Sequence, residues 1–96
     1  MKIQATLKLL DGTTATVDAT VLILSIPGWP EPITVWVHRG LGKERKWWTM
    51  TDPGTSRHIT SKHDTQSECI AEGTARLARV GHAKYLRAVQ VAIANR

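Results

Sequence analysis

Five basic side chains lie close in the sequence to a pair of adjacent tryptophans, Trp47 and Trp48. They are Arg39, Lys43, Arg45, Lys46 and Arg57. Residues 1–38 carry two basic and three acidic side chains, whereas residues 39–96 carry eleven basic and five acidic ones, so the whole net charge of +5 belongs to the second part. Cations beside aromatic rings suit phosphates, unstacked bases or an acidic protein surface. The pattern therefore predicts a surface that binds nucleic acid or an acidic partner.

Tryptophan provides four of the five aromatic side chains, and we expect two of the four to take part in binding. Trp47 and Trp48 are neighbours in an expected strand, where side chains alternate between faces, so one ring would be buried and the other exposed. The sequence leaves open which is which. A sheet face that carries Trp36, His38, the exposed ring of the pair and Arg57 would resemble the stacking platforms of proteins that bind single strands. Alternatively, Trp36 covers its own side of a small sheet. The candidate binding residues are Arg39, Lys43, Arg45, Lys46, Trp36, Trp48 and Arg57.

No group of residues has the spacing of a catalytic or metal site. The closest set of metal-binding side chains is His58, His63 and Asp64. Zinc sites take three or four ligands at recognisable spacings, and the spacing of this set argues against such a site. The carboxylates are scattered over turns and helix starts, and no two of them share an expected sheet face with a histidine at catalytic reach. The segment Gly40-Leu41-Gly42-Lys43 lacks the helix N-terminus of a phosphate-binding loop. The sequence therefore predicts a protein that acts by binding, without a catalytic site, a metal ion or a cofactor.

The composition is that of an ordinary folded chain, with 42% of the 96 residues hydrophobic and 22% charged. This length predicts one domain spanning residues 1–96. Cys69 is the single cysteine, so an intrachain disulfide is excluded, which suits a reducing compartment. The first residues lack the apolar run of a signal peptide, and no segment has the ~18 apolar residues of a membrane span. We expect a cytoplasmic protein that does not enter a membrane and is a monomer or a homodimer.

The first expected element is a β-hairpin, because apolar and polar residues alternate over residues 3–9 and again over residues 15–23. A two-residue loop would place the two apolar rows on opposite faces of the hairpin. A three-residue loop, Leu10-Asp11-Gly12, pairs Leu7 with Ala15, places both rows on one face, and has glycine at its left-handed position. We prefer this second register.

Turn residues separate three further strands, expected near residues 33–38, 45–51 and 57–60. Thr65 and Glu68 form a capping box that begins a helix over 66–80, and a last helix covers 83–94. This order predicts an α+β fold, a small antiparallel sheet of four to five strands with two C-terminal helices on one face. The expected core consists of Ile3, Leu7, Val17, Val21, Val35, Val37, Ile70, Leu77, Leu86, Val89 and Ile93.

Residues 47–78 combine a strand with tryptophan, a Pro-Gly turn, a short polar strand and a capped helix. The run is Trp48-Thr49-Met50-Thr51-Asp52-Pro53-Gly54-Thr55, Arg57-His58-Ile59-Thr60 and Thr65-Gln66-Ser67-Glu68-Cys69-Ile70-Ala71. It resembles small accessory proteins of phages and mobile elements, anti-CRISPR-like inhibitors among them. It is also loosely similar to the arm-binding domain of tyrosine recombinases, which lays its sheet in a DNA groove but lacks the long hairpin and second helix. The resemblance implies a protein that engages nucleic acid or a nucleoprotein complex, or else an inhibitor that docks on an acidic surface of a host defence complex.

Overall fold

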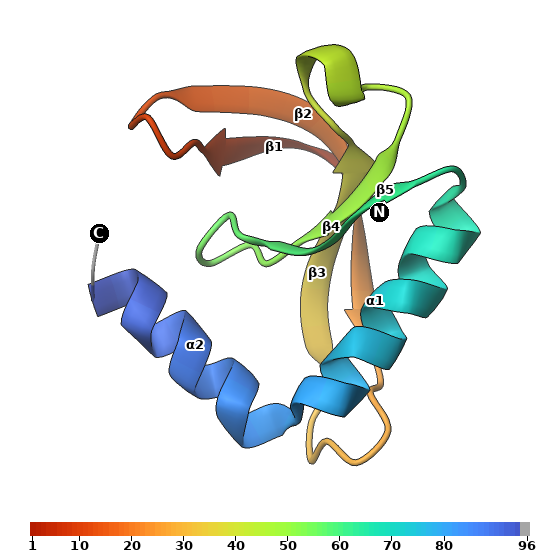
Figure 1. Cartoon of the computed structure of the whole chain (residues 1–96), viewed down its shortest axis with the longest axis vertical. Coiled ribbons are helices and arrows are strands. Elements are labelled where there is room, and N and C mark those ends of the chain that lie inside the picture. The colour runs from red at the N-terminus through yellow and green to blue at the C-terminus, as the bar shows by residue number, and fades with distance from the viewer. Residues whose placement is uncertain (95–96) are drawn as a thin grey trace.

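The computed structural model describes residues 1–94, which form a five-stranded antiparallel sheet followed by two helices (Figure 1). The strands are β1 (Lys2–Lys8), β2 (Thr14–Leu24), β3 (Ile33–Arg39), β4 (Trp48–Thr51) and β5 (His58–His63). A single 3₁₀ turn, η1 (Gly42–Glu44), precedes β4, and the helices are α1 (Gln66–Val80) and α2 (His82–Ala94). Strand order across the sheet is the order in the chain, so each strand pairs with its neighbour in sequence. The predicted α+β fold class is confirmed.

The N-terminal hairpin has the predicted three-residue loop and register. Leu7 pairs with Ala15, and Ala5 pairs with Val17. The Leu9 N–H donates to Thr13 O at 2.8 Å, which closes the loop, and Gly12 takes the left-handed conformation with φ 87°. A residue with a Cβ would be strained at this position, which explains the glycine.

The segment from residue 40 to 47 differs from the expected strand. It folds into a compact loop around η1, in which the Gly40 N–H donates to Trp47 O and the Trp47 N–H donates to Glu44 O, both at 3.0 Å. A Cβ on Gly40 would lie 2.6 Å from Glu44 O, so the loop closes tightly only with glycine there. β4 consequently begins at Trp48, three residues later than predicted. The expected alternation of Trp47 and Trp48 within one strand is wrong, and both rings are half-buried.

The two faces of the sheet are covered in different ways. On one face, α1 packs Cys69 and Leu77 against Val35, Val37 and Met50. A Cβ on Gly73 of α1 would lie 2.5 Å from the Met50 side chain, so glycine allows the helix to approach the sheet closely.

On the opposite face, Ala5, Leu7 and Ala19 are buried because the sheet curls on itself. The β1–β2 hairpin lies over the β4–β5 turn in Figure 1, and the Lys8 N–H donates to Ser56 Oγ at 3.1 Å. Sheet twist and the two register shifts within β5 account for this curvature. The apolar residues therefore form two layers on opposite faces instead of the single core that was predicted.

Helix α1 begins and ends as the sequence predicts. Thr65 is the N-cap residue, and its Oγ1 accepts from the Glu68 N–H at 3.1 Å. Gly81 follows the helix with φ 86°, and its N–H donates to Leu77 O. Both ends thus satisfy backbone groups that a helix leaves unpaired.

Helix α2 has no buried residue, which corrects part of the predicted core. Leu86 and Ile93 are 44% and 49% exposed, and Val89 is half-buried. Of the other predicted core residues, Leu7, Val35, Val37 and Leu77 are buried, whereas Ile3, Val17, Val21 and Ile70 are half-buried. The physical reason is that α1 packs over the short strands β4 and β5, whereas Tyr85 is the one residue of α2 within residues 1–94 that packs against the core.

Tyr85 connects α2 to the rest of the molecule. Its hydroxyl donates to Asp52 Oδ1 at 2.6 Å, and its ring centroid lies 5.3 Å from that of Trp29 in the proline-rich loop. Burial raises the pKa of Tyr85, and the Asp52 carboxylate adds to this rise, so the phenol keeps its proton and its role as a donor.

His38 is only 1% exposed and is held between two neighbours. Its Nδ1 lies 2.8 Å from Arg39 O, and its Nε2 lies 2.7 Å from Thr51 Oγ1. Because a carbonyl only accepts, the neutral ring carries its proton on Nδ1, and Nε2 accepts from the Thr51 hydroxyl. Burial lowers the pKa of His38, the hydrogen bond to Arg39 opposes this, and nearby His58 lowers it further.

We expect stability to fall with decreasing pH because of His38. The unfolded chain takes up a proton at His38 near a pH of about 6.5, and the folded chain does so only at lower pH. The contribution of neutral His38 to the free energy of unfolding is therefore complete above that pH and is lost as the pH falls below it. Urea unfolding at about pH 7.5 and 5.5 should show a larger loss for the wild type than for His38→Gln, which keeps the other three histidines. Equal losses in both proteins would contradict this assignment.

Candidate nucleic-acid interface

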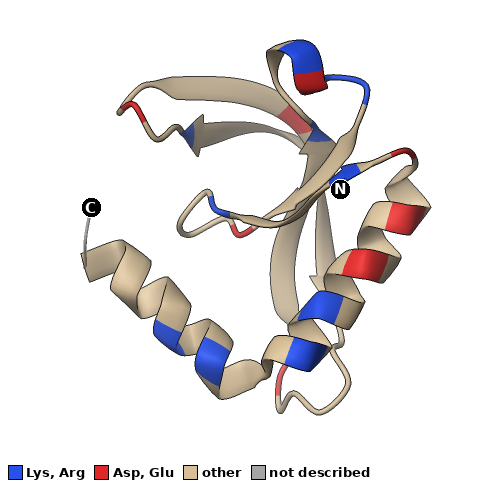
Figure 2. Cartoon of the chain, viewed as in Figure 1, with Lys and Arg blue, Asp and Glu red and all other residues tan. Residues whose placement is uncertain are grey.

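Four of the predicted basic residues gather around the η1 loop. Arg39 ends β3, Lys43 belongs to η1, and Arg45 and Lys46 precede β4. All four are exposed, and Figure 2 shows Lys and Arg concentrated at this end of the sheet. Lys62 of β5 joins them, and Trp47 and Trp48 lie among these basic residues as ring partners of Arg39, Lys46 and Lys62. We call these seven residues the basic loop cluster: Arg39, Lys43, Arg45, Lys46, Lys62, Trp47 and Trp48.

The two tryptophan rings hold three of the cations in place. Arg39 Cζ lies 4.8 Å from the Trp48 ring centroid, and the Nζ atoms of Lys46 and Lys62 lie 4.5 and 5.7 Å from that of Trp47. Arg39 and Arg45 also donate weakly, at 3.4 Å, to the carbonyls of Arg45 and Gly42. Each exposed cation–π contact stabilises its geometry by about 0.5–1 kcal/mol. The cluster is therefore partly ordered before any ligand arrives.

Lys62 is a cluster residue that the sequence does not reveal. β5 has one more residue than β4 between the pairs Trp48–His63 and Met50–Thr60, which forms a bulge. Lys62 occupies the bulge with φ 67°, a left-handed conformation that costs an L residue roughly 1–2 kcal/mol. The bulge turns its side chain toward the loop, so that Nζ lies 3.8 Å from Glu44 Oε1. No turn signal in the sequence marks this position.

A groove of about 640 Å³ runs beside the basic loop cluster. One wall contains Arg39, Arg45 and Trp48, and the opposite wall is formed by β1 and β2. That second wall carries Asp18, whose Oδ1 accepts from Gln4 Nε2 at 2.8 Å. The groove thus has a basic side and a mainly polar side, and its volume is in the usual range for ligand sites.

Two predicted site residues and one predicted neighbour do not join the cluster. Trp36 pairs with Val21 and Thr51 on the face away from α1, whereas Trp48 pairs with Arg39 on the opposite face. His38, expected beside Trp36 at the surface, is buried. Arg57 follows the β4–β5 turn, at the other end of the hairpin from Trp48 and His63. The predicted stacking platform of these residues is wrong, because strand register separates them.

A threonine, a histidine and a glutamate lie in line where β5 leads into α1. Thr60 Oγ1 is 2.6 Å from His63 Nε2, and His63 Nδ1 is 3.6 Å from Glu68 Oε1. Glu68 comes close to His63 because the chain folds back from β5 into α1, although Glu68 belongs to the helix and lies on no sheet face. Thr60 is buried, and a Cβ on Gly73 of α1 would contact its methyl group. We attribute this line of contacts to the packing of α1 on β5.

The remaining candidates within residues 1–94 are metal ligands and the cysteine thiol. No three His, Cys, Asp or Glu side chains in this range are grouped so that they could hold a metal ion. Burial raises the pKa of the Cys69 thiol to about 11, so it stays protonated and unreactive at neutral pH. None of the described helices is long and apolar enough to cross a membrane. Comparisons with protein-family models, curated proteins and solved structures found no match for this chain.

Proposed function

We propose that this protein binds nucleic acid, alone or in a nucleoprotein complex, through the basic loop cluster and the groove beside it. The observation that carries the proposal is the concentration of five exposed cations on two neighbouring segments. Among residues 1–94, Glu44 is the single carboxylate in ion-pair contact with any of them. Such a surface attracts polyanions and neutralises their phosphates.

The geometry favours contacts with phosphates over stacking with bases. Arg39 lies over Trp48, and two lysines lie near Trp47, so these rings already have cations as partners. A base could stack only on a ring surface that the cations leave free. The ammonium and guanidinium groups keep most of their donors, which suits phosphate oxygens. We therefore propose recognition of the sugar–phosphate backbone with little dependence on base sequence.

Three further predictions belong to this proposal. The protein acts by binding and has no catalytic activity. It works in the cytoplasm, and its role is that of an accessory protein of the phage or mobile-element kind, as the resemblance of residues 47–78 implies.

Titration with labelled DNA and RNA, single- and double-stranded, tests the proposal. If the five cations each neutralise one phosphate, affinity for duplex DNA should fall about 100- to 500-fold between 50 and 200 mM salt, since every neutralised phosphate releases counterion. Fluorescence anisotropy at several salt concentrations measures this slope. Absence of binding to all four nucleic acids at the lowest salt, or binding that salt leaves unchanged, would rule the proposal out.

A further inference from the structure

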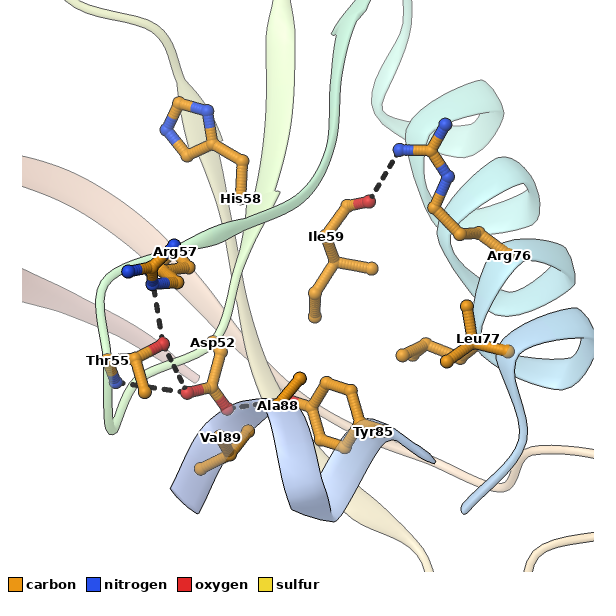
Figure 3. Close-up of a pocket in the computed structure, with 11 residues that line it drawn as sticks. Asp52, Thr55, Arg57, His58, Ile59, Arg76, Leu77, Tyr85, Ala88 and Val89 are labelled. Atoms are coloured by element: carbon orange, nitrogen blue, oxygen red, sulfur yellow. Dashed lines mark hydrogen bonds between the residues drawn. The ribbon is translucent and has the colours of Figure 1, made fainter. Parts of the chain in front are cut away.

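A second groove lies between the β4–β5 turn, the C-terminal half of α1 and the first half of α2 (Figure 3). Its volume is about 190 Å³, which is room for one large side chain. Apolar atoms line most of it, from Ile59, Leu77, Val80, Tyr85, Ala88 and Val89. We call it the apolar groove.

Two arginines lie at the edge of the apolar groove and are available to a ligand. The Arg57 guanidinium has no hydrogen-bond or ion-pair partner among residues 1–94. Arg76 uses one nitrogen, Nη1, to donate to Ile59 O at 3.1 Å, which leaves its other donors free. Both side chains are exposed. The groove therefore offers positive charge next to an apolar floor.

The carboxylate that lines the groove, Asp52, forms no ion pair with either arginine and is held by other partners. Asp52 Oδ1 accepts from the Tyr85 hydroxyl at 2.6 Å, and Oδ2 accepts from the Thr55 N–H and hydroxyl at 3.0 and 2.8 Å. Figure 3 shows these contacts between the β4–β5 turn and α2. An occupant with its own carboxylate would thus be attracted to Arg57 and Arg76.

Exposed apolar side chains continue from the groove along α2. Leu86 and Ile93 flank Val89 at spacings of three and four residues, so the three share one side of the helix. This extended strip fits a helical segment that presents apolar residues along one face. The α2 helix of a second copy fits poorly, because its charged residues, Lys84 and Arg87, are basic and would meet two arginines.

We propose that the apolar groove binds an acidic amphipathic segment of a partner protein. One large apolar side chain of that segment inserts between Ile59, Leu77 and Tyr85, and a neighbouring Asp or Glu pairs with Arg57 or Arg76. This inference goes beyond nucleic-acid binding and uses none of the residues of the basic loop cluster. The two surfaces would let one small protein join a nucleic acid to a protein, and either can fail experimentally without the other.

A selection from a displayed library of random peptides, each long enough for four helical turns, tests the inference. The full chain is the immobilised target, and enriched peptides are synthesised and titrated by fluorescence anisotropy. Ala88→Glu fills the groove and adds a negative charge, while Arg57→Glu reverses one edge charge without altering the floor. Lys84→Glu is the matched control for Arg57→Glu, since it makes the same charge change at an exposed position of α2 that does not line the groove.

Enriched peptides should carry apolar residues at helical spacing together with Asp or Glu. Their Kd should rise about tenfold or more for Ala88→Glu and Arg57→Glu and change less than about twofold for Lys84→Glu. Circular dichroism establishes that each variant is folded. The proposal is wrong if no peptide is enriched, if enriched peptides lack acidic residues, or if the control weakens binding equally. It is also wrong if sedimentation shows a dimer that Ala88→Glu dissociates, because the occupant would then be a second copy.

Discussion

Replacing Lys43, Arg45 and Lys46 together by alanine is expected to weaken binding to duplex DNA by about 10- to 100-fold at 50 mM salt. These three cations belong to the η1 loop, and all are exposed. If each neutralises one phosphate, the slope of log affinity against log salt should become shallower by about 3. The loop itself should persist, because the backbone bonds from Gly40 to Trp47 and from Trp47 to Glu44 do not involve these side chains.

A matched triple variant distinguishes the effect of the basic loop cluster on binding from the effect of the overall charge. Arg79, Lys84 and Arg87 are exposed on α1 and α2, and their replacement by alanine removes the same three charges. Binding by this control should decrease much less, with little change of the salt slope. Equal losses in the two triple variants would mean that net charge, and not the basic loop cluster, attracts the nucleic acid.

Leu77→Ala is expected to lower the free energy of unfolding by about 2–5 kcal/mol. Leu77 is 2% exposed and packs from α1 against the buried side chains of β3 and β4, so truncation leaves a cavity beneath the helix. Urea unfolding followed by circular dichroism measures the change, and an unchanged denaturant dependence would show that the unfolding reaction is the same.

Leu86→Ala makes the same chemical change in α2 and is the natural comparison. Leu86 is 44% exposed, so its truncation should cost less than about 1 kcal/mol. Had α2 packed on the sheet as the sequence predicts, the two variants would lose similar stability. A large loss for Leu86→Ala would therefore contradict the position of α2 in this structure.

Residues that are close in the sequence are sufficient to predict the N-terminal hairpin and helix α1. In the hairpin, loop length and apolar alternation agree on one register, and Gly12 marks the left-handed position. In α1, Thr65 and Gly81 mark the two ends. The position of α2 was not predictable in this way, because Leu86, Val89 and Ile93 have the spacing of a buried stripe. What decides their exposure is long-range: β4 has four residues, and α1 already covers it.

The candidate site was predictable where its residues are close in sequence. Arg39, Lys43, Arg45 and Lys46 converge because Gly40 allows the loop to close on itself. Lys62 lies in the basic loop cluster only because of a bulge in β5. Trp36 lies outside the cluster because of strand register, and Arg57 lies outside it because it is at the other end of the β4–β5 hairpin. These three outcomes depend on pairing between strands, which residue types alone do not determine.

β1 is an outer strand of the sheet, and such strands carry free backbone groups that can pair with another molecule and start aggregation. Here the end of that strand is turned toward its own chain, because the Lys8 N–H donates to the Ser56 hydroxyl. Ser56 has a left-handed φ of 61°, a conformation that lowers the stability of the turn, and it is the residue that accepts this hydrogen bond. Lys2 and Lys8 place a positive charge at each end of the strand. The curl that buries Leu7 thus also makes this end of β1 less available for pairing with a further strand.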